Sequence, residues 1–388
     1  MTTCSLLDLN KDVLFLLASY LSIKDLGRLS QVCRQLRSFC NQDAVWRNDN
    51  KKRLLATSSN GKGKYPKLNL KEICRLSRNW ENGLMKDVQL IKLKTQLLPH
   101  LQLQKDQLYV SHGENVHCYR IKNNGNISKN PVLVCSKHVH DICKFVVKDG
   151  HIVTGARDHQ INIWKLTRGP NVQFVRTLSG HSLKVNCVDT HDSMVLSGSA
   201  DKSWRLWSLE HDRCLLESEM SDRVLSVAIN SWNKNIITGT SCINDHKPLD
   251  IWNIENGKHM LTLGSNFKMG AGVLDVQYED ANTVLSCGYD TYLRIWDTRS
   301  SRSCVREYEE VDDNALYCLQ SNGGYLIATG SNRFGVVRLW DKRMTECLSK
   351  FYIGNKKSGS VYSLQFNLTN IYASLSHSIQ TLDFSDCR

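Results

Sequence analysis

The sequence predicts an all-β seven-bladed propeller preceded by a small α-helical domain, and three observations lead to this prediction. Five tryptophans, Trp164, Trp207, Trp252, Trp296 and Trp340, are separated by 43, 45, 44 and 44 residues. Each ends a short run in which apolar and polar residues alternate, as in a half-buried strand. The first fifty residues instead follow a helical spacing, so a separate domain precedes the repeats.

The length of the repeat indicates the type of propeller. The five runs read INIW, WRLW, LDIW, LRIW and VRLW, and the last two continue into Asp297 and Asp341. A period of about 40–45 residues ending in Trp-Asp is typical of a WD40 blade. One further period in each direction leads to Tyr119 and Phe384, which also end strand-like runs. We therefore expect seven WD40 blades over residues 87–388, with Asp87–Lys94 as the missing outer strand beside Phe384.

A second registry runs through two of the repeats. His138 and His181 each stand 20 residues before an aspartate and 26 before a tryptophan. In WD40 repeats similar positions form a buried relay, because buried polar groups need hydrogen-bond partners. The expected members are His138, Thr154, Asp158 and Trp164 in one repeat and His181, Ser197, Asp201 and Trp207 in the next. No nucleophile accompanies these pairs, so we predict structural relays and no catalytic residue.

In the fifth repeat, Gly270 stands at the histidine position, so that relay is expected to be incomplete. The fourth and sixth repeats carry the insertions SCINDHKPLD and NRFG. The first and seventh repeats lack the tryptophan altogether. We expect these outer blades to be the least regular.

Composition limits the remaining classes of function. The fifteen cysteines are odd in number and lack a C-x-x-C spacing, which predicts neither a disulfide framework nor a metal site. A reducing compartment follows, cytoplasmic and/or nuclear. We find no phosphate-binding loop and expect no cofactor. The apolar stretch Val13–Tyr20 is too short to span a membrane.

The N-terminal residues 7–50 have a helical apolar pattern and a specific resemblance. Val13, Leu14, Leu17, Tyr20 and Leu21 predict a first helix, and Ser22 with Asp25 predicts the start of a second. The second is expected to carry the stripe Leu26, Leu29, Cys33 and Leu36, and a third short element the residues around Asp43 and Trp46. The segment resembles an F-box through Leu9, Tyr20-Leu21, Asp25-Leu26, Leu29-Ser30, Val32-Cys33-Arg34 and Trp46-Arg47. Asn10 stands where that family usually has proline, but asparagine is also a good helix cap.

The F-box resemblance implies a binding partner. Its apolar ridge would bind the Skp adaptor of a cullin-based ubiquitin ligase. The residues implied in this interface are Leu9, Val13, Leu14, Leu17, Leu21, Leu26, Val32, Cys33 and Trp46. The alternative is that the same stripe packs only against the propeller.

Residues 51–86 are expected to be a basic linker. Lys51, Lys52 and Arg53 begin it, and Leu70–Trp80 is expected to form a docking helix. Its composition is typical of a solvated connector. A nucleic-acid or nuclear-targeting patch is the alternative.

The net charge of +12 favours acidic partners. In a WD40 propeller, the loops entering the innermost strands and the turns between second and third strands share one face. Mapped in this way, a basic rim contains Lys137, Arg157, Lys184, Lys202, Arg223, Lys268, Arg333, Lys356 and Lys357. It predicts an acidic or phosphorylated peptide as substrate, with a merely solvated basic surface as the alternative. The acidic stretch Glu307–Asp313 interrupts this rim.

Over nearly its whole length, the chain resembles the dactylin-type F-box/WD-repeat family, especially in MGAGVLDVQYEDANTVLSCGYDTYLRIWD and ATGSNRFGVVRLWD. The resemblance implies a non-enzymatic substrate receptor that presents a protein for ubiquitination and proteasomal degradation. It does not carry over the identity of that substrate. The alternative is a basic scaffold that binds nucleic acid or assembles protein complexes without ubiquitin transfer, and the scarcity of aromatic residues among the linker's basic residues disfavours nucleic acid.

Overall fold

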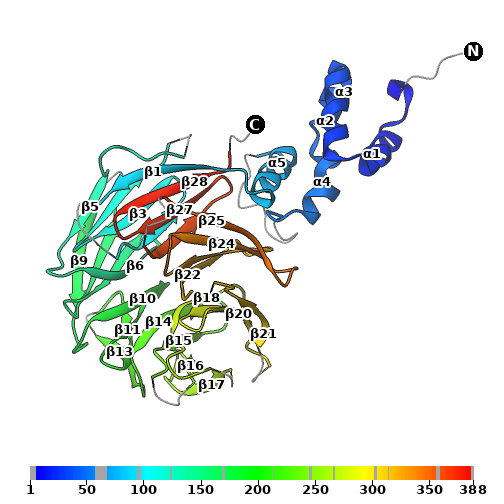
Figure 1. The fold of residues 1–388 in the computed structure, drawn as a ribbon. Coiled ribbons are helices and arrows are strands. Elements are labelled where there is room, and N and C mark those ends of the chain that lie inside the picture. Colours follow the sequence, from blue (N-terminus) through cyan, green and yellow to red (C-terminus); the bar gives the residue numbers. More distant parts are fainter. Residues whose placement is uncertain are drawn as a thin grey trace, which may run out of the picture. The chain divides into compact units, whose positions relative to one another are not determined.

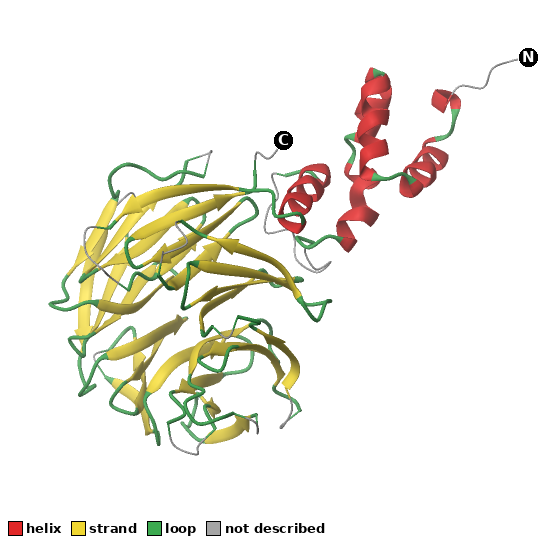
Figure 2. Ribbon diagram, in the orientation of Figure 1, coloured by secondary structure: helices red, strands yellow, loops and turns green. Residues whose placement is uncertain are grey.

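The computed structural model describes residues 6–56, 68–93, 98–122, 125–167, 171–211, 213–243, 247–264, 267–300, 304–312, 314–354 and 359–385. The chain divides into two compact units (Figure 1). The helical unit comprises Met1–Met85 together with Asn322–Leu326 and Phe384–Arg388. The propeller unit comprises Lys86–Ser321 and Ile327–Asp383. Figure 2 shows the helices in red and the strands in yellow, and the α-helices all belong to the helical unit.

The helical unit contains one 3₁₀ turn and five α-helices. These are η1 (Leu6–Asp8), α1 (Lys11–Tyr20), α2 (Ile23–Val32), α3 (Arg34–Cys40), α4 (Asp43–Lys52) and α5 (Leu70–Glu81). The second predicted helix is wrong in one respect, because it is broken into α2 and α3. Cys33 is extended, with φ −154° and ψ 168°, and its sulfur accepts a hydrogen bond from the Leu36 amide at 3.4 Å. Neither glycine nor proline marks this break in the sequence.

Side chains cap the helix starts as their residue types predict. The Asn10 side chain accepts a hydrogen bond from the Asp12 amide at the start of α1. Ser22 Oγ accepts from the Asp25 amide at 3.2 Å and donates to the Asp25 carboxylate at 2.6 Å. Both arrangements satisfy amide groups that the first helical turn leaves without an intrahelical partner.

Helix α5 joins the linker and the C-terminal residues to the helical unit. The Leu55 amide donates to Ser77 Oγ at 3.1 Å. Phe384 stacks on Trp80 with ring centroids 4.2 Å apart, and Asn79 Nδ2 donates to the Phe384 carbonyl at 2.7 Å. The basic residues at positions 62, 64 and 67 lie outside the described part of the chain.

Seven four-stranded antiparallel sheets form the propeller unit. From the innermost strand outward, the first three blades are β2 (Leu101–Gln104), β3 (Gln107–His112), β4 (Asn115–Arg120), β5 (Leu133–Ser136); β6 (Ile142–Lys148), β7 (His151–Ala156), β8 (Ile161–Leu166), β9 (Val172–Leu178); β10 (Val185–His191), β11 (Met194–Ser199), β12 (Ser203–Ser208), β13 (Cys214–Glu219).

The next three blades follow the same order. They are β14 (Val224–Asn230), β15 (Asn235–Thr240), β16 (Leu249–Asn253), β17 (His259–Leu263); β18 (Val273–Tyr278), β19 (Thr283–Gly288), β20 (Tyr292–Asp297), β21 (Cys304–Glu309); β22 (Leu316–Ser321), β23 (Leu326–Ser331), β24 (Val336–Asp341), β25 (Cys347–Tyr352).

The seventh blade closes the ring with a strand from the other end of the propeller. It contains β26 (Val361–Phe366), β27 (Asn370–Leu375), β28 (Ser378–Asp383) and, as its outer strand, β1 (Lys86–Lys92). Strands β1 and β28 are antiparallel, from Lys86 opposite Asp383 to Lys92 opposite Ser378. The predicted outer strand is therefore confirmed, and closure removes an exposed sheet edge.

Strand register corrects one aromatic position. Trp207 lies opposite Val195, the second residue of β11, and Tyr119 lies opposite Leu108, the second residue of β3. In the seventh blade, the second residue of β27 pairs with Leu382. The prediction that Phe384 continues the tryptophan series is therefore wrong by two residues. An equal spacing along the chain could not reveal this because the seventh repeat is differently spaced.

The tryptophans and small residues make the blades pack closely on one another. Trp207 lies in one apolar cluster with Val153 and Ile161 of the preceding blade. Burial of such a side chain stabilises the fold by roughly 1.5–3 kcal/mol. A Cβ at Gly198 would lie 2.4 Å from a methyl group of Val224 in the next blade. Glycine is needed there because the two strands approach too closely for any side chain.

The innermost strands are also joined by polar side chains. The Asp189 carboxylate accepts a hydrogen bond from the Ile229 amide of the next blade at 2.8 Å, and Gln102 Oε1 accepts one from the Val147 amide at 2.6 Å. Lys144 Nζ lies 3.0 Å from the Asp275 carboxylate although 131 residues separate them. The first two contacts join neighbouring blades, and the Lys144–Asp275 pair joins the second blade to the fifth across a central channel of about 540 Å³.

Candidate protein-binding surfaces

Helix α1 displays large apolar side chains that the helical unit leaves uncovered. Val13 and Leu17 are each 43% exposed, Leu16 is 57% exposed and Tyr20 is 81% exposed. Their spacing of three or four residues puts them on one side of the helix. An apolar surface of this kind on a small unit indicates a protein partner.

The structure divides the nine predicted adaptor residues into three groups. Val13, Leu17, Leu21 and Val32 are exposed; Leu9, Leu14 and Cys33 are half-buried; Leu26 and Trp46 are buried. Leu26 and Trp46 pack in the core with Phe39 and Cys40, and Trp46 Nε1 donates to the Cys40 carbonyl at 2.7 Å. The assignment of Leu26 and Trp46 to the adaptor contact is therefore corrected, because both side chains hold the helices together.

Sequence reasoning left Leu6, Leu16 and Tyr20 out of the predicted contact residues. All three are exposed. Tyr20 already belonged to the helical pattern, so its exposure could have been suspected from the end position that it takes on the helix. Leu16 lies beside the expected stripe, and no feature of the sequence distinguished it from a core residue.

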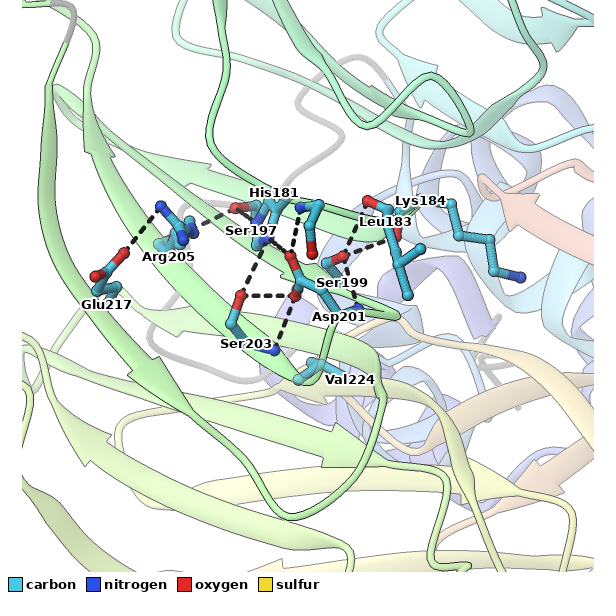
Figure 3. A network of polar contacts seen from close by, with 12 residues as sticks. His181, Leu183, Lys184, Ser197, Ser199, Asp201, Ser203, Arg205, Glu217 and Val224 are labelled. Carbon is cyan, nitrogen blue, oxygen red and sulfur yellow. Dashed lines mark hydrogen bonds and ion pairs between the residues drawn. The ribbon is translucent and has the colours of Figure 1, made fainter.

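Two relays on the propeller have the geometry expected from the matched spacing. His181 Nδ1 lies 2.8 Å from the Asp201 carboxylate and Nε2 lies 2.8 Å from Ser197 Oγ. Figure 3 shows His181 between these two side chains. Trp207 Nε1 then donates to Ser197 Oγ at 2.9 Å. Four groups from a loop, a turn and two strands are thus joined in the third blade.

The second blade repeats only part of this arrangement. His138 Nδ1 lies 2.7 Å from the Asp158 carboxylate and Nε2 lies 2.6 Å from Thr154 Oγ1. Among the described residues, the Trp164 indole has no hydrogen bond to Thr154, and its ring instead meets the His138 ring edge-on at 6.2 Å. The expectation that Trp164 completes the relay is therefore corrected.

Charge and burial identify what these histidines do. Burial lowers the pKa of His138 and of His181 although the neighbouring aspartates favour the protonated form. Each ring is therefore neutral at pH 7, with an Nδ1–H that donates to the aspartate and an Nε2 that accepts from the hydroxyl. This arrangement satisfies buried groups and links a loop to a strand, which is a structural role.

Other blades keep the hydroxyl and indole but replace the histidine. Trp296 Nε1 donates to Ser286 Oγ at 2.8 Å, and Trp340 Nε1 donates to Thr329 Oγ1 at 2.8 Å. In the fifth blade, where Gly270 replaces histidine, Asp290 pairs with Arg294. An arginine two residues before the tryptophan does not by itself indicate this pairing, because Arg205 takes the same position before Trp207 in the blade that keeps its histidine.

The basic rim follows from the strand order. In every antiparallel blade, the loop into the innermost strand and the turn between the second and third strands lie at the same end of the sheet, which we call the top face. All seven described residues of the predicted rim are exposed there: Lys137, Arg157, Lys184, Lys202, Arg223, Lys268 and Arg333. Lys356 and Lys357 lie outside the described residues.

The acidic stretch that interrupts the rim pairs with arginines of the propeller, although the side chains of Glu307 and Asp312 stay partly exposed. Glu307 pairs with Arg294 at 2.9 Å, Asp312 pairs with Arg338 at 2.8 Å, and Glu310 also pairs with Arg338. The stretch therefore replaces the missing histidine relays of its neighbourhood and reduces the positive rim less than its sequence suggested. Position 313 lies outside the described residues.

A small cavity of about 160 Å³ lies among the first three blades. Its lining includes Arg157, Lys184, Asn186, Asp141 and Cys143. Burial raises the pKa of the Cys143 thiol although Lys184 and Arg157 oppose that rise. The thiol is therefore protonated at pH 7 and is not a nucleophile. Two cations and an amide make the cavity suited to one anionic group.

Comparisons with known proteins show the family to which the chain belongs. An F-box-like family model matches residues 8–51, and the model of the WD domain, G-beta repeat, matches residues 172–208 and 259–297. Human F-box/WD repeat-containing protein 4 is 40% identical over 390 residues, which cover 97% of this chain and 92% of that protein. The chain belongs to the F-box/WD-repeat family.

Further relatives of this F-box/WD-repeat protein show how far the likeness extends. The mouse F-box/WD repeat-containing protein 4 is 40% identical over 385 residues, covering 97% of this chain and 93% of its own. Cell division control protein 4 of Candida albicans is 30% identical over 142 residues, 32% of this chain and 20% of that protein. The WD40 β-propeller domain of Doa1 has a TM-score of 0.62 and 18% identity, covering 76% of this chain and 96% of its own, which shows the fold alone.

The described part of this F-box/WD-repeat protein contains neither a helix that could span a membrane nor a group of side chains that could hold a metal ion. Among the described residues, no helix is both long and apolar enough to cross a bilayer. The same residues form no group of three or more histidine, cysteine or acidic side chains able to hold a metal ion.

Proposed function

We propose that this F-box/WD-repeat protein is the substrate-recognition subunit of a Skp/cullin/F-box ubiquitin ligase, acting in the cytoplasm, the nucleus or both. The helical unit binds the Skp adaptor and through it the cullin core. The propeller binds an acidic or phosphorylated protein substrate. The observation that carries the proposal is the uncovered apolar side of α1 within the region that matches the F-box-like family.

The helical surface fits a groove on a protein partner. An amphipathic helix binds such a groove through side chains spaced three or four residues apart, and a few large ones supply most of the free energy. Tyr20, at the end of this row, is 81% exposed, and Leu17, in the middle of the row, is 43% exposed. Val32, 71% exposed, extends the apolar surface to the end of α2.

The receptor itself performs no chemistry in this proposal. It raises the local concentration of substrate lysines near a ubiquitin-charged enzyme elsewhere in the complex. The neutral histidines of the relays support this reading, since each is held between an aspartate and a hydroxyl that the fold itself requires.

The test is co-purification of the full chain with the Skp adaptor. Leu17→Glu combined with Tyr20→Glu is expected to reduce recovery of the adaptor at least tenfold, because two charges enter an apolar interface. Leu14 is a poorer choice because it is half-buried against the core of the helical unit. The control is Arg28→Glu, whose side chain is 80% exposed on α2.

Thermal unfolding of each variant separates lost binding from lost folding. Equal recovery of the adaptor by the wild type and the Leu17/Tyr20 variant, both folded, would sink the interface assignment.

The alternative scaffold that binds nucleic acid is favoured by the net charge of +12 and the exposed basic rim. A competition with RNA, described below, distinguishes it.

A further inference from the structure

An aromatic cluster lies on the top face of the propeller. Across the mouth of the central channel lies the small cavity lined by Arg157 and Lys184, which we call the anion cavity. Tyr317 and Tyr362 are the second residues of innermost strands β22 and β26, and both line the channel. Tyr289 follows β19 directly and is 48% exposed. Its ring meets Tyr317 edge-on at 6.2 Å, and the Tyr317 and Tyr362 rings lie 5.8 Å apart. Three blades thus build one aromatic surface, which we call the tyrosine platform.

The tyrosine platform has polar groups available as well as apolar area. Among the described residues, no hydrogen bond is formed by the three tyrosine hydroxyls, and none of them is buried without access to water. Leu225 and Leu274, at the same position of β14 and β18, continue the apolar lining of the mouth. A ligand side chain that rests here would meet carbon surface and hydroxyl donors together.

Phe334 adds an aromatic side chain to the same face, from a turn separate from the three tyrosines of the platform. It lies in the turn between β23 and β24 and is 53% exposed, with φ +60°. A bulky residue rarely adopts this left-handed conformation, which costs on the order of 1 kcal/mol or more. Folding alone does not account for a strained phenylalanine whose ring lies in water.

Hydrogen bonds on both sides hold the Phe334 turn in place. The Gly335 amide donates to the Gly359 carbonyl at 2.8 Å, and Ser360 Oγ donates to the Asn332 carbonyl at 2.7 Å. The Asn332 amide in turn donates to the Ala315 carbonyl at 2.9 Å. The ring is therefore presented on a rigid turn, and little conformational entropy is lost when a ligand packs against it.

The opposite side of the mouth has a different chemistry. Arg157 and Lys184 line the anion cavity among the first three blades, whereas the tyrosine platform and Phe334 belong to blades five to seven. Acidic groups also line this region: Asp141 in the cavity, and Asp189 and Asp275 in the channel. A continuous run of phosphates would meet these carboxylates, so the arrangement favours a peptide with one anionic group over a nucleic-acid strand.

We propose that the tyrosine platform and Phe334 receive a large apolar or aromatic side chain of the substrate, while Arg157 and Lys184 bind an acidic or phosphorylated residue of the same peptide. This inference deepens the proposed function and rests on the propeller being the substrate-binding unit. The apolar side chain supplies most of the binding free energy, since buried aromatic contacts dominate such interfaces. The anionic group sets orientation and specificity.

The experiment selects ligands for the purified full chain from a displayed library of random twelve-residue peptides. The expected result is enrichment of phenylalanine, tryptophan or leucine at one position, with glutamate or aspartate a few residues away. Phe334→Asn and Tyr317→Ser each remove the apolar preference and retain the acidic one. Arg157→Glu with Lys184→Glu removes the acidic preference and retains the apolar one.

The stability of Phe334→Asn and one control variant make the result interpretable. Asparagine tolerates a positive φ, so Phe334→Asn keeps or raises the melting temperature while it weakens the best synthetic peptide at least tenfold. Trp232→Ser is the matched control, because Trp232 is 57% exposed in a turn between first and second strands, at the opposite end of its blade. It is expected to leave both preferences unchanged.

The synthetic form of the best peptide is then compared with its phosphoserine version, which distinguishes carboxylate from phosphate as the anion. An apolar preference that is absent, or that persists in Phe334→Asn and Tyr317→Ser, overturns the inference. Tighter binding of a twelve-nucleotide single-stranded RNA than of the best peptide overturns it in favour of nucleic acid. None of these readouts uses the Skp adaptor, so failure here and failure of the proposed adaptor contact are separate results.

Discussion

At the residue scale, two relays with the same spacing differ in how many partners one hydroxyl serves. Ser197 Oγ contacts both the His181 ring and the Trp207 indole, whereas Thr154 Oγ1 contacts the His138 ring and not the Trp164 indole. The sequence predicted the histidines, hydroxyls and aspartates because their spacing matches a loop, a strand and a turn. It could not predict whether the fourth member closes, since that depends on tenths of an ångström in side-chain placement.

The difference predicts unequal costs for two matched substitutions. Ser197→Ala leaves a buried indole N–H and a ring nitrogen without partners and should lower the free energy of unfolding by about 2–4 kcal/mol. Thr154→Val leaves only the ring nitrogen and should cost about 1–2 kcal/mol. Urea unfolding followed by tryptophan fluorescence measures both. Equal costs would show that the Trp207 hydrogen bond adds nothing.

At the element scale, the sequence predicted that the strands exist better than it predicted where they begin and end. For the helices, it predicted the apolar stripes better than the helix boundaries. The alternation before each tryptophan and the outer strand near Asp87 were both informative, because side chains on a strand alternate between two faces. The break at Cys33 was not visible, because a helical stripe continues through it and only the backbone turns. The ion pairs of Arg294 and Arg338 were equally hidden. Arg294 pairs with Asp290 in a turn and Glu307 on β21, and Arg338 pairs with Glu310 and Asp312 in the loop that follows β21.

The closing strand β1 allows a direct test of ring closure. Ile91 is half-buried against the apolar cluster that contains Leu101 and Ile379, whereas Val88 on the same strand is 37% exposed. Ile91→Asp should lower the free energy of unfolding by about 2–3 kcal/mol and speed hydrogen exchange in β28, because it places a charge in apolar contact. Val88→Asp is the control and should cost less than about 1 kcal/mol. Unchanged exchange in β28 for Ile91→Asp would mean that β1 does not secure the blade.

At the scale of the whole molecule, the sequence predicted a helical domain, a linker over residues 51–86 and a propeller, whereas in the structure Met1–Met85 belongs to one helical unit. The sequence separated the functional surfaces only in part. Repeat length predicted seven blades, and helical spacing predicted a separate N-terminal unit. Exposure was the missing information: Leu26 and Trp46 match the F-box pattern as well as Leu21 does, yet they form the core whereas Leu21 is exposed. The tyrosine platform was also hidden, because Tyr289, Tyr317 and Tyr362 come together only when blades five to seven close the ring.

The central proposal is that the apolar side of α1 and the top face of the propeller act on the same substrates. The first surface binds the ligase and the second binds the substrate. The most direct measurement is the cellular inventory of proteins whose ubiquitination and abundance depend on this chain, compared among cells that express the wild type, Leu17→Glu/Tyr20→Glu, or Phe334→Asn/Tyr317→Ser. The account predicts that both variants lose ubiquitin from, and stabilise, one shared set of proteins, while Arg28→Glu and Trp232→Ser change none of them. Two unrelated sets, or no protein that responds to the helical variant, would contradict it.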